Sequence, residues 1–142
     1  MNQGMESGSQ QKPFRKRLGF GFAMGLILLA AAYLCISWII GAGVRSISET
    51  ALREYPGDGV SALMALVESE RHSMRDRNRA IWALGQLGDS RALLLLEKHF
   101  TGKPSDERYE LSQYELKKAI VLCKGATNIS ALVWRHGAMT TR

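Results

Sequence analysis

The sequence has few of the residues from which metal sites and disulfide frameworks are built. Its 142 residues include two cysteines and three histidines. The histidines form no H-x-x-x-H pair, and the cysteines form no C-x-x-C pair. We therefore expect no bound metal and no cofactor. A disulfide between Cys35 and Cys123 is not expected either, because Cys35 lies deep inside a long apolar run.

Catalytic signatures are missing as well. The chain contains no serine nucleophile elbow and no phosphate-binding glycine loop, and its paired glutamates have no catalytic arrangement. A chain of this length makes one modest domain, which excludes a large multidomain enzyme and a polytopic transporter. We predict that the protein is not an enzyme.

Positive charge is present but is not concentrated in one domain. The formal net charge is +6, and it divides equally between residues 1–44 and the rest of the chain. A dedicated nucleic-acid binder shows a concentrated basic footprint. We therefore expect no nucleic-acid partner.

The longest feature of the sequence is an uncharged apolar run. Leu18–Val44 contains 27 residues without a charge, whereas about 20 apolar residues suffice to span a bilayer. The run predicts a transmembrane helix over 18–44. A cleaved signal peptide is the alternative, with Gly41-Ala42-Gly43 as a weak cleavage site, but the apolar part of such a peptide is shorter.

The flanks of this run predict its orientation. Residues 1–17 end in a basic cluster and are otherwise polar, so we expect a disordered, basic, cytoplasmic tail. The domain after the helix then lies on the extracytoplasmic side, which is the periplasm in a bacterium. Gly21 and Gly25 form a G-x-x-x-G pair that suits close packing of a second membrane helix, including a homodimer. Trp38 fits the outer membrane interface.

The rest of the chain has the pattern of an all-α domain. From Gly57 onward the apolar residues recur with a helical period, and no stretch alternates as a strand does. We predict a linker or short helix over 45–56, a helical domain over 57–135 and a flexible tail over 136–142. The pairs Gly57-Asp58 and Gly88-Asp89 predict helix ends, with glycine closing one helix and aspartate capping the next.

Segments of this domain repeat. Three stretches consist of a turn, a capping Asp or Asn, and then Ala-Leu; the Ala-Leu pairs begin at positions 62, 92 and 131. The first two pairs are 30 residues apart and the last two are 39 residues apart. The helices that precede the last two pairs align at the same 39-residue offset, which matches Arg79 with Lys118 and Trp82 with Val121. This spacing indicates a helix-pair repeat present about two and a half times.

The segment RAIWALGQLGD, followed by RAL, resembles the short bacterial HEAT-like repeats, a type also found in phycobiliprotein lyases. The resemblance covers residues 57–133 and implies a short α-solenoid. It also implies that Arg77 is the family's buried arginine, which pairs with an aspartate of a neighbouring repeat. Leu116 takes that position in the next repeat, which implies a degenerate terminal repeat acting as a cap.

These features together predict a membrane-anchored protein–protein interaction module, an accessory or scaffolding subunit whose partners are membrane or periplasmic proteins. Candidate contacts on exposed helix faces are Arg75, Arg79, Trp82, Arg91 and Tyr114. The arginines have two interpretations, a solvated helix start or a contact to an acidic partner or lipid headgroup. Two alternatives stay open: a structural subunit that packs through Gly21 and Gly25, and a lyase-like protein that handles a chromophore or cofactor.

Overall fold

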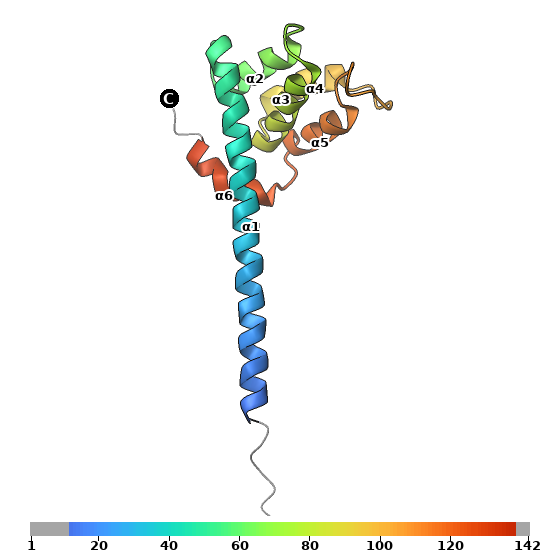
Figure 1. The fold of residues 1–142 in the computed structure, drawn as a ribbon. Coiled ribbons are helices and arrows are strands. Elements are labelled where there is room, and N and C mark those ends of the chain that lie inside the picture. The colour runs from blue at the N-terminus through green and yellow to red at the C-terminus, as the bar shows by residue number, and fades with distance from the viewer. Residues whose placement is uncertain (1–11, 139–142) are drawn as a thin grey trace, which may run out of the picture. The chain divides into compact units, whose positions relative to one another are not determined.

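The computed structural model describes residues 12–138, and every regular element within them is helical (Figure 1). This confirms the all-α prediction. The chain divides into two compact units, Met1–Cys35 and Ile36–Arg142. The elements in chain order are α1 (Lys12–Glu54), α2 (Gly59–Glu68), α3 (Met74–Leu87), the 3-10 helix η1 (Ser90–Ala92), α4 (Leu93–His99), α5 (Gln113–Cys123) and α6 (Ile129–Ala138).

The described part of the first unit is the N-terminal part of α1. Its side chains from Gly21 to Cys35 are all exposed and are mostly large and apolar. α1 is long and apolar enough to cross a membrane. The predicted disordered tail of residues 1–17 is too long, because helix begins at Lys12. Pro13 suits the first turn of a helix, where its missing N–H leaves no hydrogen bond unmade. Residues 1–11 lie outside the described part.

The second unit begins inside α1 rather than at Gly57. We expected a linker or short helix over 45–56, but α1 continues without a break to Glu54. Nothing interrupts helix formation before Pro56 and Gly57. From Ser37 onward, one face of α1 is buried in the core of the second unit. We call it the α1 core face; it consists of Ser37, Gly41, Val44, Ile47 and Ala51.

The predicted repeat occurs two and a half times because α2 has no partner helix before it. The part of α1 that carries the α1 core face supplies this helix. Three successive helix pairs result: the end of α1 with α2, α3 with η1 and α4, and α5 with α6. Their apolar faces share one hydrophobic cluster, which contains Val44 and Ile47 as well as residues from α2 to α6. α6 extends to Ala138, three residues into the predicted C-terminal tail, whose last four residues are outside the described part.

The 39-residue offset is visible in the burial pattern. The deeply buried positions of α3 are matched 39 residues later by buried positions of α5: Arg77, Ala80, Ile81 and Leu84 correspond to Leu116, Ala119, Ile120 and Cys123. α3 and α5 pack directly, and a Cβ at Gly85 would lie 2.8 Å from the Cα of Ala119. Glycine at this position therefore permits the close approach of the two helices.

The predicted caps are present. Asp58 accepts a hydrogen bond from the backbone N–H of Ser61 at 2.8 Å and caps α2, while Asp89 accepts from the N–H of Arg91 at 2.9 Å. Gly88 closes α3 with φ 62° and ψ 31°, a left-handed conformation that glycine adopts without strain. These turns fix where each helix of a pair ends and the next begins.

Arg77 is buried as the resemblance implies, but its partner differs. Its Nε donates a hydrogen bond to the carbonyl oxygen of Val67, in α2, at 2.8 Å. Among the described residues no carboxylate lies within ion-pair distance of its guanidinium. The expected pairing with an aspartate is therefore wrong, because a carbonyl oxygen at the end of α2 takes that place.

Gly85→Ala tests the contact between α3 and α5. The added methyl group would push against the backbone of Ala119, which cannot move as a flexible side chain can. We expect a net loss of about 1–2 kcal/mol in the free energy of unfolding, since overpacking outweighs the better helix propensity of alanine. Urea unfolding of the full chain in detergent, followed by circular dichroism, measures it. Gly25→Ala, at a helical glycine with open space around it, is the control and should not lower the free energy of unfolding, because the added methyl group meets nothing.

Candidate protein-binding surface

The five residues predicted to bind a partner occupy three different environments. Arg91 belongs to a network of ion pairs, Trp82 is partly buried against α1, and Arg75, Arg79 and Tyr114 are exposed on α3 and α5. They do not converge on one pocket. Each environment decides what its residues can do.

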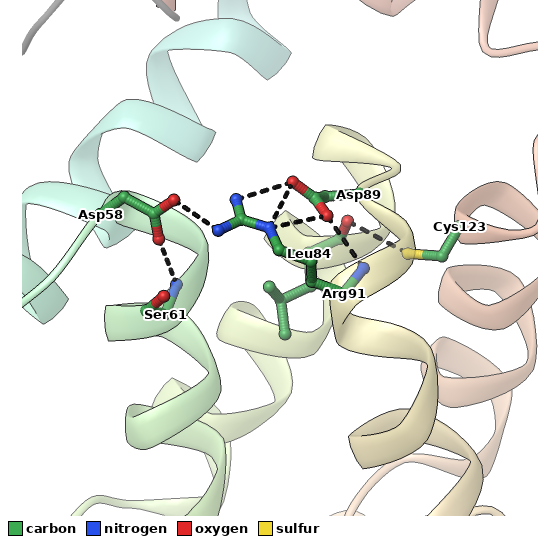
Figure 2. A network of polar contacts seen from close by, with 6 residues as sticks. All are labelled: Asp58, Ser61, Leu84, Asp89, Arg91 and Cys123. Atoms are coloured by element: carbon green, nitrogen blue, oxygen red, sulfur yellow. Dashed lines mark hydrogen bonds and ion pairs between the residues drawn. The ribbon is translucent and has the colours of Figure 1, made fainter.

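Arg91 connects the starts of two helices (Figure 2). Its Nη1 donates to Oδ2 of Asp58 at 2.7 Å, and its Nη2 donates to Oδ2 of Asp89 at 2.8 Å. Its Nε lies 3.1 Å from both oxygens of Asp89. The two aspartates are the N-caps of consecutive helix pairs, so the guanidinium joins the cap of α2 to the cap of η1.

The network shifts the proton affinities of its members. The hydrogen bond from the Ser61 N–H, together with the Arg91 guanidinium, lowers the pKa of Asp58 to about 2. The same guanidinium lowers the pKa of Asp89, and the two carboxylates raise the pKa of Arg91. Because two carboxylates surround one cation, this group carries a net negative charge. Arg91 is thus engaged within the fold and is not a free cation for a partner.

Trp82 is a packing residue of the second unit. A Cβ at Gly43 would lie 3.2 Å from Cη2 of Trp82, so the indole tip rests against the glycine surface of α1. The side chain is half-buried. Its offset partner Val121 is exposed on α5.

The remaining three predicted residues belong to one exposed surface. Arg75 and Arg79 lie one turn apart on α3, and their equivalents at the 39-residue offset on α5 are Tyr114 and Lys118. We call this surface the α3–α5 face; it consists of Arg75, Arg79, Tyr114, Lys118 and Val121, all exposed. α3 packs directly on α5 at Gly85 and Ala119, so the two stripes lie on neighbouring helices. Sequence reasoning missed Lys118 and Val121 as site residues, although the offset aligns them with Arg79 and Trp82.

The chemistry of the α3–α5 face is basic with an apolar and aromatic part. Lys118 Nζ lies 4.8 Å from the ring centroid of Tyr114, a cation–π distance, and 3.5 Å from a carboxylate oxygen of Glu115. Within the described residues Arg75 and Arg79 form no ion pair. Exposed arginine and tyrosine are enriched at protein interfaces. The face therefore combines positive charge with exposed aromatic and apolar surface.

A shallow depression of about 480 Å³ lies beside this face. Its walls come from the start of α3 and the loop before α5: Ser73, Met74, Arg75, Asn78, Asp106, Glu107 and Arg108. Most of these residues are polar or charged, and the depression opens widely to solvent. Across residues 21–135 no group of three potential metal ligands comes together.

Cys123 is a core residue, as its alignment with Leu84 predicts. Its Sγ lies 3.6 Å from the carbonyl oxygen of Leu84, and burial raises the pKa of the thiol to about 11. A thiol in this state is a poor nucleophile at neutral pH. It packs the contact between α3 and α5.

Comparison with known families identifies one repeat. Residues 76–101 match the PBS lyase HEAT-like repeat. The matched segment covers most of α3 and all of η1 and α4, which form the middle helix pair. No curated protein and no solved structure matches the chain. A HEAT-like repeat is characteristic of protein-interaction modules, and the α3–α5 face begins on this repeat.

Asp58→Asn tests the ion-pair network. Asparagine still caps α2 but removes the charge that faces Arg91. Ionised Asp58 stabilises the fold above its ordinary pKa of 3.8, and this contribution disappears as the pH falls toward its folded pKa of about 2. We expect the variant to lose up to about 1 kcal/mol at pH 7, because the pair is half-exposed, and to equal the original chain near pH 2.

Urea unfolding of the full chain between pH 2 and pH 7 measures this difference. Asp106→Asn is the matched control, because Asp106 pairs with an arginine two residues away in its own loop. A loss that persists unchanged at pH 2 would contradict the electrostatic explanation.

Proposed function

We propose that this chain is a membrane-anchored protein-interaction module, an accessory or scaffolding subunit that acts by binding rather than by catalysis. The observation that carries the proposal is the α3–α5 face, an exposed basic and aromatic surface that starts on a HEAT-like repeat. The three helix pairs form a short α-solenoid in this proposal. A stack of this kind presents a preformed surface along its outer helices.

The anchor in this proposal is the N-terminal part of α1. Its exposed apolar side chains from Gly21 to Ile36 suit lipid contact. The basic residues before Leu18 favour a cytoplasmic N-terminus, which leaves α2–α6 on the extracytoplasmic side. Cleavage as a signal peptide at Gly41–Gly43 would remove part of the α1 core face, including the glycine against which Trp134 packs. That cost favours a retained helix.

The partner in this proposal is another membrane or periplasmic protein with an acidic surface. Anchoring both proteins in one bilayer raises their effective concentration, so a modest contact area suffices for binding. Arg75, Arg79 and Lys118 supply the charge. Tyr114 and Val121 supply the apolar contact.

A second candidate function has its own supporting observation. A Cβ at Gly21 or Gly25 would meet nothing within 4 Å, so α1 presents a smooth, open face there. Such a face allows a second membrane helix to approach closely. In this case the chain is a structural subunit of a larger integral complex, or a homodimer, and the α3–α5 face is not the main contact.

Charge reversal on the α3–α5 face tests the first proposal. Native membranes containing the tagged full chain are extracted with a mild detergent, and stoichiometric co-purifying proteins are identified. The amount of partner that co-purifies with the variant Arg75→Glu/Arg79→Glu/Lys118→Glu should fall at least tenfold. Each reversed charge leaves an acidic group of the partner unpaired or repelled. The control Arg53→Glu/Lys103→Glu changes exposed cations elsewhere and should retain the partner.

The same preparation separates the two candidate functions. Gly21→Leu/Gly25→Leu fills the open face of α1 and should leave the partner bound if the α3–α5 face is the contact. Loss of the partner with this variant, and retention with the charge reversal, would overturn the first proposal in favour of the structural subunit.

A further inference from the structure

α6 has apolar side chains on two opposite faces. Ala131 and Trp134 are buried against the rest of the unit. On the other side of the helix lies a second apolar set, which we call the α6 face; it consists of Ile129, Leu132 and Val133, exposed by 64%, 61% and 45%. Three branched apolar residues turned away from the core suit an environment other than water.

The contacts of α1 show where α6 lies within the second unit. Trp134 packs on Gly41, where a Cβ would lie 2.8 Å from its Cβ and Cγ. The contact with α3 follows at Gly43, and the contact with α2 follows at Ser48. Along α1, α6 therefore lies nearer to Ile36, and α2 lies nearer to the C-terminal end of the helix at Glu54 (Figure 1). Gly41 itself belongs to the uncharged run.

The length of the apolar run places this crossing close to the membrane surface. Leu18–Trp38 has 21 residues, which as a helix spans about 31 Å, the thickness of the hydrocarbon core. Trp38 is exposed and suits the interface, where tryptophan is enriched. Gly41 follows about 4.5 Å farther along the axis. With α1 spanning the bilayer as proposed above, α6 lies at about the depth of the lipid headgroups.

We propose that the α6 face lies in the bilayer, at the boundary between headgroups and acyl chains of the leaflet next to the second unit. α6 is then an interfacial helix and a second membrane contact of this chain, besides α1. The proposal rests on the membrane anchor in the proposed function, because it needs α1 to span the bilayer.

Lipid is favoured over a second copy of the chain as the occupant, because Gly41, on which α6 packs, belongs to the uncharged run and follows the exposed Trp38 by three residues. Ile36 and Ile39 are exposed on the side of α1 away from Gly41, so apolar surface suited to lipid reaches this level of the helix. An interfacial helix buries its apolar side about 5–10 Å into the headgroup–acyl boundary, which is within reach of a helix at the level of Gly41. On the opposite side, Nε and Nη2 of Arg135 donate to the carbonyl oxygen of Gln86 at 3.1 and 2.7 Å, which fixes α6 to α3.

Spin-label accessibility in lipid nanodiscs tests this placement. Single cysteines replace Leu132, Leu94 and Ile27 of the full chain in a Cys35→Ala background, and Cys123 stays because it is buried. Leu94 is a matched leucine on α4, 83% exposed. Each label is assayed for collision with oxygen, which partitions into lipid, and with a water-soluble nickel chelate. Circular dichroism confirms that each variant retains its helices.

We expect the label at Leu132→Cys to collide several-fold more with oxygen relative to nickel than the label at Leu94→Cys. Equal, water-like ratios at these two positions would overturn the proposal. Protection of the Leu132→Cys label from both reagents would also overturn it and show that protein covers the α6 face. The label at Ile27→Cys distinguishes failure of the anchor: if it too is water-accessible, α1 does not span the bilayer and the proposed function fails as well.

Discussion

Burial of the α1 core face is the constraint on which the helical unit depends. Val44, Ile47 and Ala51 are almost completely buried, and each contributes to the same apolar cluster as α2 through α6. A helix pair of a repeat stack buries only one face against its neighbours, and about three pairs are needed for a stable core. α2–α6 alone supply two and a half. α1 therefore belongs to both units: its exposed apolar part lies in the first unit, and the α1 core face lies in the second.

The fold after Gly57 could be predicted because its polar and apolar residues contrast. The 39-residue offset and the capping aspartates mark the helix ends, and the buried positions of α3 and α5 follow that offset. The end of α1 could not be predicted in the same way. Within the uncharged run nearly every position is apolar, so a buried face has little contrast with an exposed one. The period appears only after Arg45, in Ile47 and Ala51, which is too short a stretch to define a core helix.

The sequence could predict which residues of the candidate site are exposed. It could not predict the contacts that those residues make with segments far away in the chain. Arg75 and Tyr114 are exposed at equivalent positions of α3 and α5, the first helices of consecutive pairs, which the offset predicts. The engagement of Arg91 was not predictable, because its partner Asp58 lies 33 residues away and only the packing of α2 against η1 brings them together. Trp82 packs on Gly43 of α1, a residue within the predicted membrane segment of 18–44, so its core contact could not be predicted.

Hydrogen exchange of the full chain in nanodiscs tests the central claim, that residues 44–54 are a core helix of the second unit. Exchange of their amides is compared with that of the buried part of α3 as urea is raised. The structure predicts slow exchange in both segments and a parallel loss of protection, because one cooperative core contains both. Fast exchange over 44–54 at urea concentrations where α3 stays protected would contradict it and return this segment to the role of a linker.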